Sequence, residues 1–274
     1  MKRLLAVAVA GLAFVACKKA DTNTGDDDTQ PGADASTQQM TTDVTTDVTT
    51  NTTWSGLIRV HSPINVVAGV TLDVAAGSTI QFDGSAGITV AGTVNVNGVK
   101  GSVVTIQPAP GGHYWRSWGL ATGKLNMTYV VSKGGGFSIT NTGSLTARDS
   151  EFSNTNGDLL VSSGGSIDLQ YSWIGLPEGT ADSTHCDMHF EGGNPTVTVS
   201  HSNISTSSYG LMFYIGQGLD LTYNNWFANS MDIDLRAGVT GDVSGGYFKK
   251  GNPTSATLTK NNMATAMVAD AGPR

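Results

Sequence analysis

Leu125-Asn-Met-Thr-Tyr-Val-Val-Ser132 begins a frame that recurs as Leu145-Thr-Ala-Arg-Asp-Ser-Glu-Phe152 and Ile167-Asp-Leu-Gln-Tyr-Ser-Trp-Ile174. The frame continues in residues 197–204 and 219–226, and in a degenerate form in residues 239–246. The starts lie 20, 22, 30, 22 and 20 residues apart. A fixed period of this length is typical of a repeat protein whose units stack on one another.

A second column of apolar-x-apolar pairs lies between these frames with the same period: Phe137/Ile139, Leu159/Val161, Met188/Phe190, Leu211/Phe213 and Ile233/Leu235. The alternation predicts short strands, with positions one, three and eight of the first frame pointing inward. Position six predicts a polar stack at a tight turn, made of Ser150, Ser172, Ser202, Asn224 and Ser244. Both columns share one insertion, between residues 175 and 187.

Each unit is too small to bury its own inner face, so units stacked about 4.8 Å apart build parallel sheets around a continuous core. The pattern resembles the right-handed parallel β-helix of the pectate-lyase-like superfamily, whose coils carry an inward Asn or Ser at that turn. The resemblance implies an all-β, single-stranded solenoid over residues 54–251, with about eight or nine coils. Trp115 and Trp118 are expected to cover its core, and residues 252–274 to form a C-terminal cap or a disordered tail.

Composition agrees with an all-β chain. Gly contributes 35 of 274 residues and charged residues only 14%. These values argue against a helical bundle, a coiled coil and an ordinary α/β enzyme. The net charge of −7 argues against a nucleic-acid surface.

The N-terminus predicts export. A basic start is followed by an uncharged apolar run over residues 4–16, which is too short to span a bilayer and fits a signal peptide over residues 1–16. Phe14-Val15-Ala16-Cys17 resembles the bacterial lipoprotein signal, which implies a lipidated Cys17 anchored to a membrane. Lys18 in place of Asp favours the outer membrane or cell surface, with the periplasmic side also open. An ordinary cleaved signal is the alternative, and a free Cys17 would permit a disulfide with Cys186.

Residues 17–53 form the next predicted segment. Residues 18–53 are almost free of apolar side chains and hold seven Asp against two Lys. Such a composition predicts a disordered acidic tether between the lipid and the solenoid.

The second column places charged residues on one predicted outer face. Asp187, His189 and Glu191 are expected to line up there, near the inserted Asp182, His185 and Cys186. Asp158, Leu160 and Ser162 are expected outward one coil below, and Asp232, Asp234 and Arg236 on the last coil.

Three interpretations of this face stay open. Asp187, His189 and Glu191 are candidate catalytic residues, because paired carboxylates can act as acid and base on a glycosidic bond. Alternatively, His185 and His189 with the carboxylates are candidate ligands of a divalent metal such as calcium, although no cofactor is required. The third interpretation is a solvated surface. The signature residues of β-helix lyases and polygalacturonases are not recognisable, which favours a non-enzymatic protein.

Position five of the first frame forms another ladder, containing Tyr129, Asp149, Tyr171, His201 and Tyr223. A tyrosine on alternate coils recurs every ~9.6 Å, a spacing suited to stacking successive sugars. Tyr129, Tyr171, His201 and Tyr223 are therefore candidate ligand-binding residues. Shielding of the neighbouring turns is the alternative.

The sequence therefore predicts a membrane-anchored surface lipoprotein whose β-helix binds polysaccharide or extracellular matrix without catalysis. The expected partners are the membrane, through the lipid, and a polysaccharide, with no nucleic acid. One alternative is a polysaccharide lyase or glycoside hydrolase that uses the Asp187/His189/Glu191 face. The other is a structural surface or adhesion component.

Overall fold

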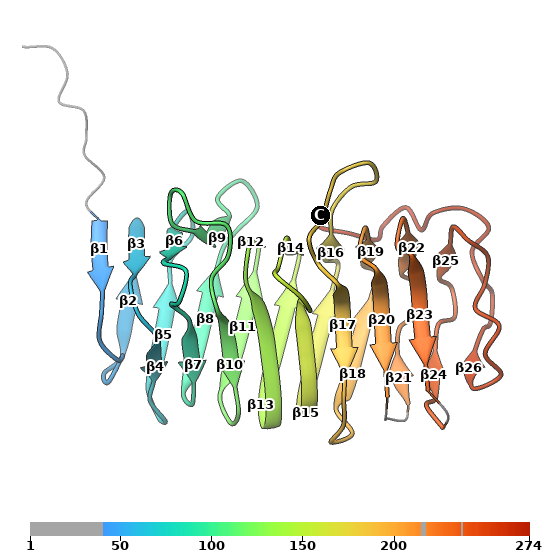
Figure 1. Ribbon diagram of the computed structural model, residues 1–274, viewed down its shortest axis with the longest axis horizontal. Helices are drawn as coiled ribbons and strands as arrows, with labels where there is room; N and C mark the ends of the chain where they lie inside the picture. Colours follow the sequence, from blue (N-terminus) through green and yellow to red (C-terminus); the bar gives the residue numbers. More distant parts are fainter. Residues whose placement is uncertain (1–40, 215–217, 237) are drawn as a thin grey trace, which may run out of the picture. The chain divides into compact units, whose positions relative to one another are not determined.

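The chain winds into a parallel β-solenoid of about nine turns. A computed structural model describes residues 41–214, 218–236 and 238–274, and in them every named element is a β-strand (Figure 1). The strands of successive turns pair in parallel. The predicted all-β parallel solenoid is confirmed.

Each turn contributes to three sheets. The first sheet contains β1 (Thr41–Val44), β3 (Leu57–Val60), β6 (Thr79–Phe82), β9 (Val104–Pro108), β12 (Val130–Lys133), β14 (Glu151–Ser153), β16 (Trp173–Gly175), β19 (Asn203–Ser205), β22 (Asn225–Phe227) and β25 (Tyr247–Phe248). The second contains β2 (Thr52–Trp54), β5 (Thr71–Val74), β8 (Thr93–Asn97), β11 (Lys124–Thr128), the ends of β13 (Gly136–Arg148) and β15 (Leu160–Gln170), β18 (Thr196–Ser200), β21 (Leu219–Asp220), β24 (Gly241–Asp242) and β26 (Leu258–Thr259).

The third sheet faces the viewer in Figure 1 and carries most of the chemistry discussed below. It contains β4 (Ile64–Val66), β7 (Ile88–Val90), β10 (Ser117–Leu120), the starts of β13 and β15, β17 (Cys186–Phe190), β20 (Tyr209–Phe213) and β23 (Met231–Leu235). Strands β13 and β15 are long because each bends from the third sheet into the second without a break.

The core is one continuous column of apolar side chains. Leu125 pairs with Leu145, Leu145 with Ile167, and Ile167 with Val197, and all four side chains are buried as predicted. Trp115 and Trp118 also lie in this core, and the Trp115 ring stacks on Phe82 at 4.2 Å. Like side chains thus stack on like in successive turns, which is how a solenoid buries short strands.

A sharp corner links the second sheet to the first in every turn. The residue at position five has left-handed backbone geometry, with φ between 47° and 57° in Tyr129, Asp149, Tyr171, His201 and Tyr223. The next residue points inward, and its side chain accepts the corner amide of the preceding turn, as in Ser150 N to Ser172 Oγ (3.4 Å) and Ser202 N to Asn224 Oδ1 (2.8 Å). This polar ladder satisfies backbone groups that the corner removes from the sheets.

The structure corrects the predicted solenoid at its N-terminal boundary. Strand β1 and most of β2 lie within residues 41–53, where a disordered tether was expected, and Val48 is buried against the core. The solenoid therefore begins by residue 41, because Thr- and Val-rich segments extend its sheets despite their polar composition. The predicted signal peptide, Cys17 and the rest of the tether lie outside the described residues.

Two predicted registers were also wrong. Phe137 pairs with Leu160, not Leu159, so Leu160 and Ser162 point inward and Val161 outward. Leu159 and Leu160 are both apolar, so hydrophobicity alone could not decide which of them pairs with Phe137. A shift of one residue exchanges the inward and outward positions of the whole strand. In the last frame Leu219 pairs with Gly241, which leaves Ser244 outside the polar ladder.

Residues 260–274, the return segment, run back along the solenoid after β26 (Figure 1). The Val268 amide donates to Asn225 Oδ1 at 2.7 Å, and the Gly272 amide donates to the His201 carbonyl at 2.8 Å. These contacts support an ordered covering of the corner, the first of the two interpretations of residues 252–274.

Candidate functional site

The outer face of the third sheet carries one aligned column of residues across eight turns. Strand pairing places its members in register: Asn65, Thr89, Gly119, Ser138, Val161, His189, Met212 and Asp234. With turns about 4.8 Å apart the column is about 34 Å long. Its N-terminal half is small and polar, and its C-terminal half bears His189 and acidic groups.

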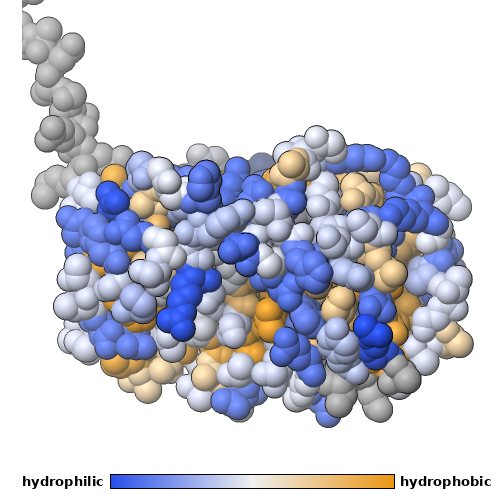
Figure 2. Space-filling view, viewed as in Figure 1, coloured by the Kyte–Doolittle hydropathy of each residue, from blue (hydrophilic) through white to orange (hydrophobic). Residues whose placement is uncertain are grey.

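A pocket of about 250 Å³ lies beside the middle of this column. Ser138 and Val161 form part of its floor, and Arg116, Asn156 and Asp158 are among the residues around it. Arg116 and Asn156 are exposed and Asp158 is half-buried. The pocket therefore offers a guanidinium, an amide and a carboxylate to one ligand. Figure 2, in the same view, shows hydrophilic and hydrophobic areas side by side on this face.

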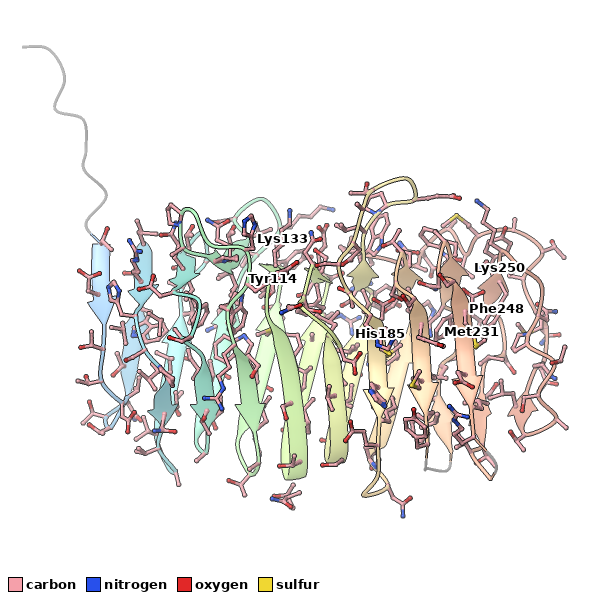
Figure 3. All side chains as sticks on the ribbon, in the orientation of Figure 1. Tyr114, Lys133, His185, Met231, Phe248 and Lys250 are labelled. Atoms are coloured by element: carbon pink, nitrogen blue, oxygen red, sulfur yellow. The ribbon has the colours of Figure 1, made fainter. Side chains whose placement is uncertain are left out.

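Sequence reasoning missed Arg116 and Asn156. Both belong to connections between strands, where the apolar columns give no signal. The Gly- and Pro-rich stretch Pro108-Ala-Pro-Gly-Gly112 before Arg116 does mark a long connection. A second pocket of about 290 Å³ lies along this connection, lined in part by Tyr114 and Lys133 (Figure 3).

Asp158 joins two histidines on the next turn. Its Oδ2 lies 2.6 Å from His189 Nδ1, and its Oδ1 lies 2.9 Å from His185 Nδ1. Burial acts to raise the pKa of Asp158, but the hydrogen bonds from His189, His185 and Cys186 outweigh burial and hold that pKa below its ordinary value. Asp158 is thus an ionised carboxylate that fixes the orientation of both imidazoles.

Cys186 lies directly beneath this cluster. It is fully buried, its amide donates to Asp158 Oδ1 at 3.1 Å, and its Sγ lies 3.3 Å from His185 Nδ1. Burial and then the charge of Asp158 raise the pKa of the Cys186 thiol far above its ordinary value. Without a bound cation the thiol stays protonated, so it is not a nucleophile.

The prediction that Asp187, His189 and Glu191 share an outward face was wrong for Asp187. Its side chain is fully buried, and Oδ2 accepts a hydrogen bond from Ser207 at 2.9 Å. Burial raises the pKa of Asp187 well above its ordinary value, against the opposing effect of Ser207. Simple strand alternation failed here because the Asp187 side chain turns toward the segment between β19 and β20, where the Ser207 hydroxyl donates to it.

Glu191 does lie outward, with its Oε1 4.0 Å from His189 Nδ1, and its side chain is about half exposed. The face thus presents Asp158, His189 and Glu191 together. Glycoside hydrolysis by acid and base uses an ionised carboxylate beside one that can donate a proton, and Asp158 matches the ionised partner. The raised pKa values at Asp187 and Asp232 belong to carboxylates inside the wall of the solenoid.

The predicted aromatic column has a different arrangement from the one expected. Tyr171, His201 and Tyr223 stack face to face, with ring centroids 4.9 Å apart in both pairs. The guanidinium of Arg274 lies 3.6 Å from the Tyr171 ring centre. Ring faces are therefore occupied within the column, and its exposed parts are ring edges. Tyr129 lies at the same corner, and ligand binding by these four residues stays a prediction.

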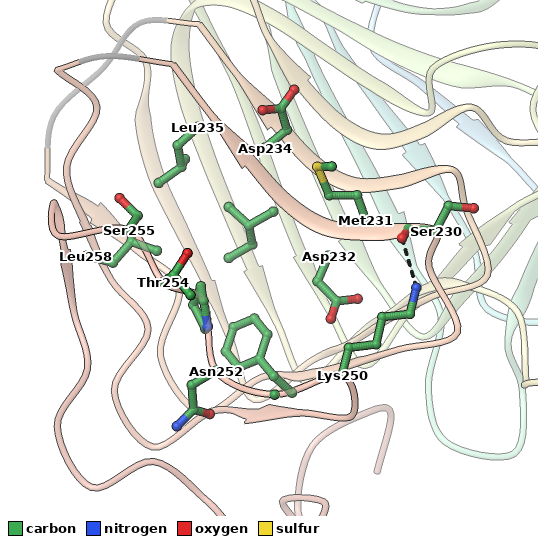
Figure 4. Close-up of a pocket in the computed structure, with 14 residues that line it drawn as sticks. Ser230, Met231, Asp232, Asp234, Leu235, Lys250, Asn252, Thr254, Ser255 and Leu258 are labelled. Atoms are coloured by element: carbon green, nitrogen blue, oxygen red, sulfur yellow. Dashed lines mark hydrogen bonds between the residues drawn. The ribbon is translucent and has the colours of Figure 1, made fainter.

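A third cavity, of about 480 Å³, lies at the C-terminal end of the solenoid against β23, bordered by Asp232, Phe248 and Lys250 (Figure 4). Lys250 Nζ donates to the carbonyls of Asn229 and Ser230, which ties the following loop to β23. Asp232 is therefore part of the wall of this cavity. The predicted outward pair is present, with Arg236 Nη2 3.5 Å from Asp234 Oδ2.

None of the described residues forms a helix that is long and apolar enough to span a membrane. Comparisons with protein-family models, with curated proteins and with solved structures give no match. The arguments that follow therefore use the residues of this chain alone.

Proposed function

We propose that this protein is a non-enzymatic binding module that holds an extended polysaccharide along the outer face of its third sheet. The observation that carries the proposal is the pocket of about 250 Å³ lined by Arg116, Asn156 and Asp158 beside the aligned column. As part of the same proposal, a lipidated Cys17 anchors the module to the outer membrane or cell surface.

The shape of the face suits a polymer. Gly119 has no side chain and Ser138 a short one, so the middle of the column is a low floor. The connection before β10 and the segment before β15 both supply residues around the pocket, and because these strands run parallel the two segments border the column along one edge. A ligand of repeating units can meet a new turn about every 4.8 Å, over a column about 34 Å long.

The chemistry of the face suits sugars. Arg116, Asn156 and Asp158 offer the charged and amide hydrogen-bonding groups that hydroxyl-rich ligands require. Farther along the sheet, Tyr214 is 40% exposed, and the Arg236 guanidinium lies 5.1 Å from its ring centre. An exposed aromatic ring with polar neighbours offers an apolar surface to the face of a sugar ring.

Binding is favoured over cleavage by the state of the carboxylates. Asp158 is held ionised by its histidine neighbours, so it is a poor general acid. The carboxylates whose pKa is raised are buried and face away from this pocket. The lyase or hydrolase alternative would need Glu191 or a histidine of this face as its proton donor.

A glycan panel tests the proposal with purified full-length protein and variants. Gly119→Leu fills the floor of the column, and a Cβ there meets nothing closer than 3.8 Å, so the fold should be retained. Gly119→Leu and Arg116→Ala should each weaken retention of the bound polysaccharide about tenfold or more, which is about 1.4 kcal/mol. Tyr223→Ala, on another surface, should leave retention unchanged.

Retention lost only in Tyr223→Ala would overturn this assignment in favour of the aromatic column. New reducing ends or unsaturated uronate products would overturn the non-enzymatic part of the proposal. For the anchor, Cys17→Ser should move the protein from the membrane fraction to the soluble fraction. A variant that stays with the membranes would contradict lipid anchoring.

A further inference from the structure

Three side chains from two adjacent turns bring nitrogen, oxygen and sulfur donors together at the surface of the third sheet, and a second imidazole borders them. A carboxylate oxygen of Asp158, a ring nitrogen of His185 and Sγ of Cys186 all lie within 4.8 Å of one another. His189 adds a second imidazole, with Nδ1 2.6 Å from Asp158 Oδ2. Asp158 precedes β15, and the other three residues lie at the start of β17 or within it.

The distances are close to those between the ligands of a tetrahedral metal site, and those to Asp158 are shorter. Bond lengths of 2.0–2.3 Å to nitrogen, oxygen and sulfur place neighbouring ligand atoms about 3.3 to 3.8 Å apart. Cys186 Sγ lies 3.3 Å from His185 Nδ1, and Asp158 Oδ1 lies 2.9 Å from the same atom. A cation would replace the protons these atoms now share, with a small outward adjustment of the donors.

The surroundings of the donors favour a positive ion. The carboxylate of Asp158 places a negative charge beside the buried Cys186, whose amide donates to Asp158 Oδ1 at 3.1 Å. On the same face, Glu191 Oε1 lies 4.0 Å from His189 Nδ1. Among the described residues, no Lys or Arg forms an ion pair with Asp158. The ion pairs of Asp158 are with His185 and His189. The His185 side chain, labelled in Figure 3, is 54% exposed, so its ring can be reached from solvent.

The donor types select the ion. Calcium and magnesium take oxygen ligands, whereas imidazole and thiolate suit zinc and neighbouring transition metals. We propose that Asp158, His185, Cys186 and His189 bind one divalent transition-metal ion of the zinc type. Calcium was the example of a divalent metal expected from the sequence for this face, whereas these nitrogen and sulfur donors favour a softer ion. The site does not depend on polysaccharide binding, although Asp158 borders the proposed pocket.

The bound ion would act as a structural clamp. It would tie the inserted segment that ends at His185 to the turn before β15, across neighbouring turns of the solenoid. Binding would release the proton of the Cys186 thiol and protect the sulfur from oxidation, because a coordinated thiol is deprotonated by the metal.

Cobalt(II) is the probe for the test. The full-length protein is stripped with a chelator, titrated with Co²⁺ and then with Zn²⁺. The expected result is one equivalent of Co²⁺, with a near-ultraviolet sulfur-to-cobalt charge-transfer band that Zn²⁺ abolishes. Cys186→Ala should remove this band. His185→Ala should weaken Zn²⁺ binding at least tenfold, and its exposed position protects the fold.

His61→Gln is the matched control, because His61 also lies between two carboxylates, Asp43 and Asp83, but has no thiol near it. Its Co²⁺ spectrum and Zn²⁺ affinity should equal those of the parent protein. Absence of the charge-transfer band, or Zn²⁺ affinity unchanged in both Cys186→Ala and His185→Ala, would overturn the proposal. Neither result would affect the glycan experiment, whose variants lie outside the four donors.

Discussion

The guanidinium of Arg274 lies 3.0 Å from Asp149 Oδ1, although 125 residues separate the two in the chain. The same guanidinium covers the ring of Tyr171, one turn farther along the corner. The Asp149 side chain is 5% exposed and the Arg274 side chain 46%. This ion pair fastens the far end of the return segment to the middle of the solenoid.

Removing the charge of Asp149 should loosen the return segment. Asp149→Asn keeps a residue that tolerates the left-handed corner, where φ is 51°, and removes the ion pair. We expect residues 264–274 to exchange their amide hydrogens faster, with at most about 1 kcal/mol lost in global stability. Hydrogen exchange followed by mass spectrometry measures both regions.

Arg274→Gln should give the same local effect, and the double variant should be no worse than either single one. Asp220→Asn is the control, since its carboxylate bonds to neighbouring Thr222 and not to the return segment. Unchanged exchange over residues 264–274 in both single variants would show that the backbone contacts at Asn225 and His201 suffice.

The polar ladder should be far more sensitive than the surface. Asn224 accepts the Ser202 amide at 2.8 Å and donates to the Val199 carbonyl at 2.6 Å, and all of these groups are buried. Asn224→Ala leaves two backbone groups without partners, at about 1–3 kcal/mol each. We expect urea denaturation to show a loss of about 2 to 5 kcal/mol. Exposed Asn65→Ala should stay within about 0.5 kcal/mol, and an equal loss in both variants would contradict this assignment.

The repeated columns made the fold predictable. Leu125, Leu145, Ile167 and Val197 needed only a shared period to be placed above one another, and the strand pairing confirms that placement. The polar ladder at position six was predicted from the same alignment. The columns repeat over several turns, which fixes most placements, but the frames at Leu159 and Ser244 were still misplaced.

The candidate site was less predictable because it lies where the repeat is interrupted. Asp187 follows an insertion, and its carboxylate, which alternation placed in solvent, is buried beside Ser207 of the next turn. Asp158 was placed on a strand, yet it precedes β15 and reaches the next turn from a connection. Arg116 and Asn156 belong to connections whose course no period describes. The residues of the two proposed sites therefore lie mostly where periodicity carries least information.

Corner geometry gives a test of position five. Tyr223 has φ 57°, and its side chain is 48% exposed. A β-branched residue is strained in left-handed geometry, whereas Asn tolerates it. Tyr223→Val should therefore be about 1 to 2 kcal/mol less stable than Tyr223→Asn, although both lose the stacking on His201. Chemical denaturation compares the two directly, and equal stabilities would argue against a left-handed corner.

The N-terminal turn should depend on pH through His61. Its two ring nitrogens lie 2.8 Å from Asp83 and 2.8 Å from Asp43, so it links β1 to the turn that follows. The hydrogen bond with Asp43, and then that with Asp83, raise the pKa of His61 above its ordinary value of 6.5, against a smaller opposing effect of burial. The protonated imidazole therefore favours the folded state.

Because the folded pKa of His61 is raised, its stabilisation is complete below about pH 6.5 and is lost as the pH rises through the folded value. We expect the amides of β1 to lose protection over that range, after correction for the intrinsic pH dependence of exchange. His61→Gln should show low protection of β1 at every pH, whereas His113→Gln should behave like the parent protein. A corrected β1 protection that is independent of pH in the parent would mean that the backbone pairing of β1 with β3 holds the strand by itself.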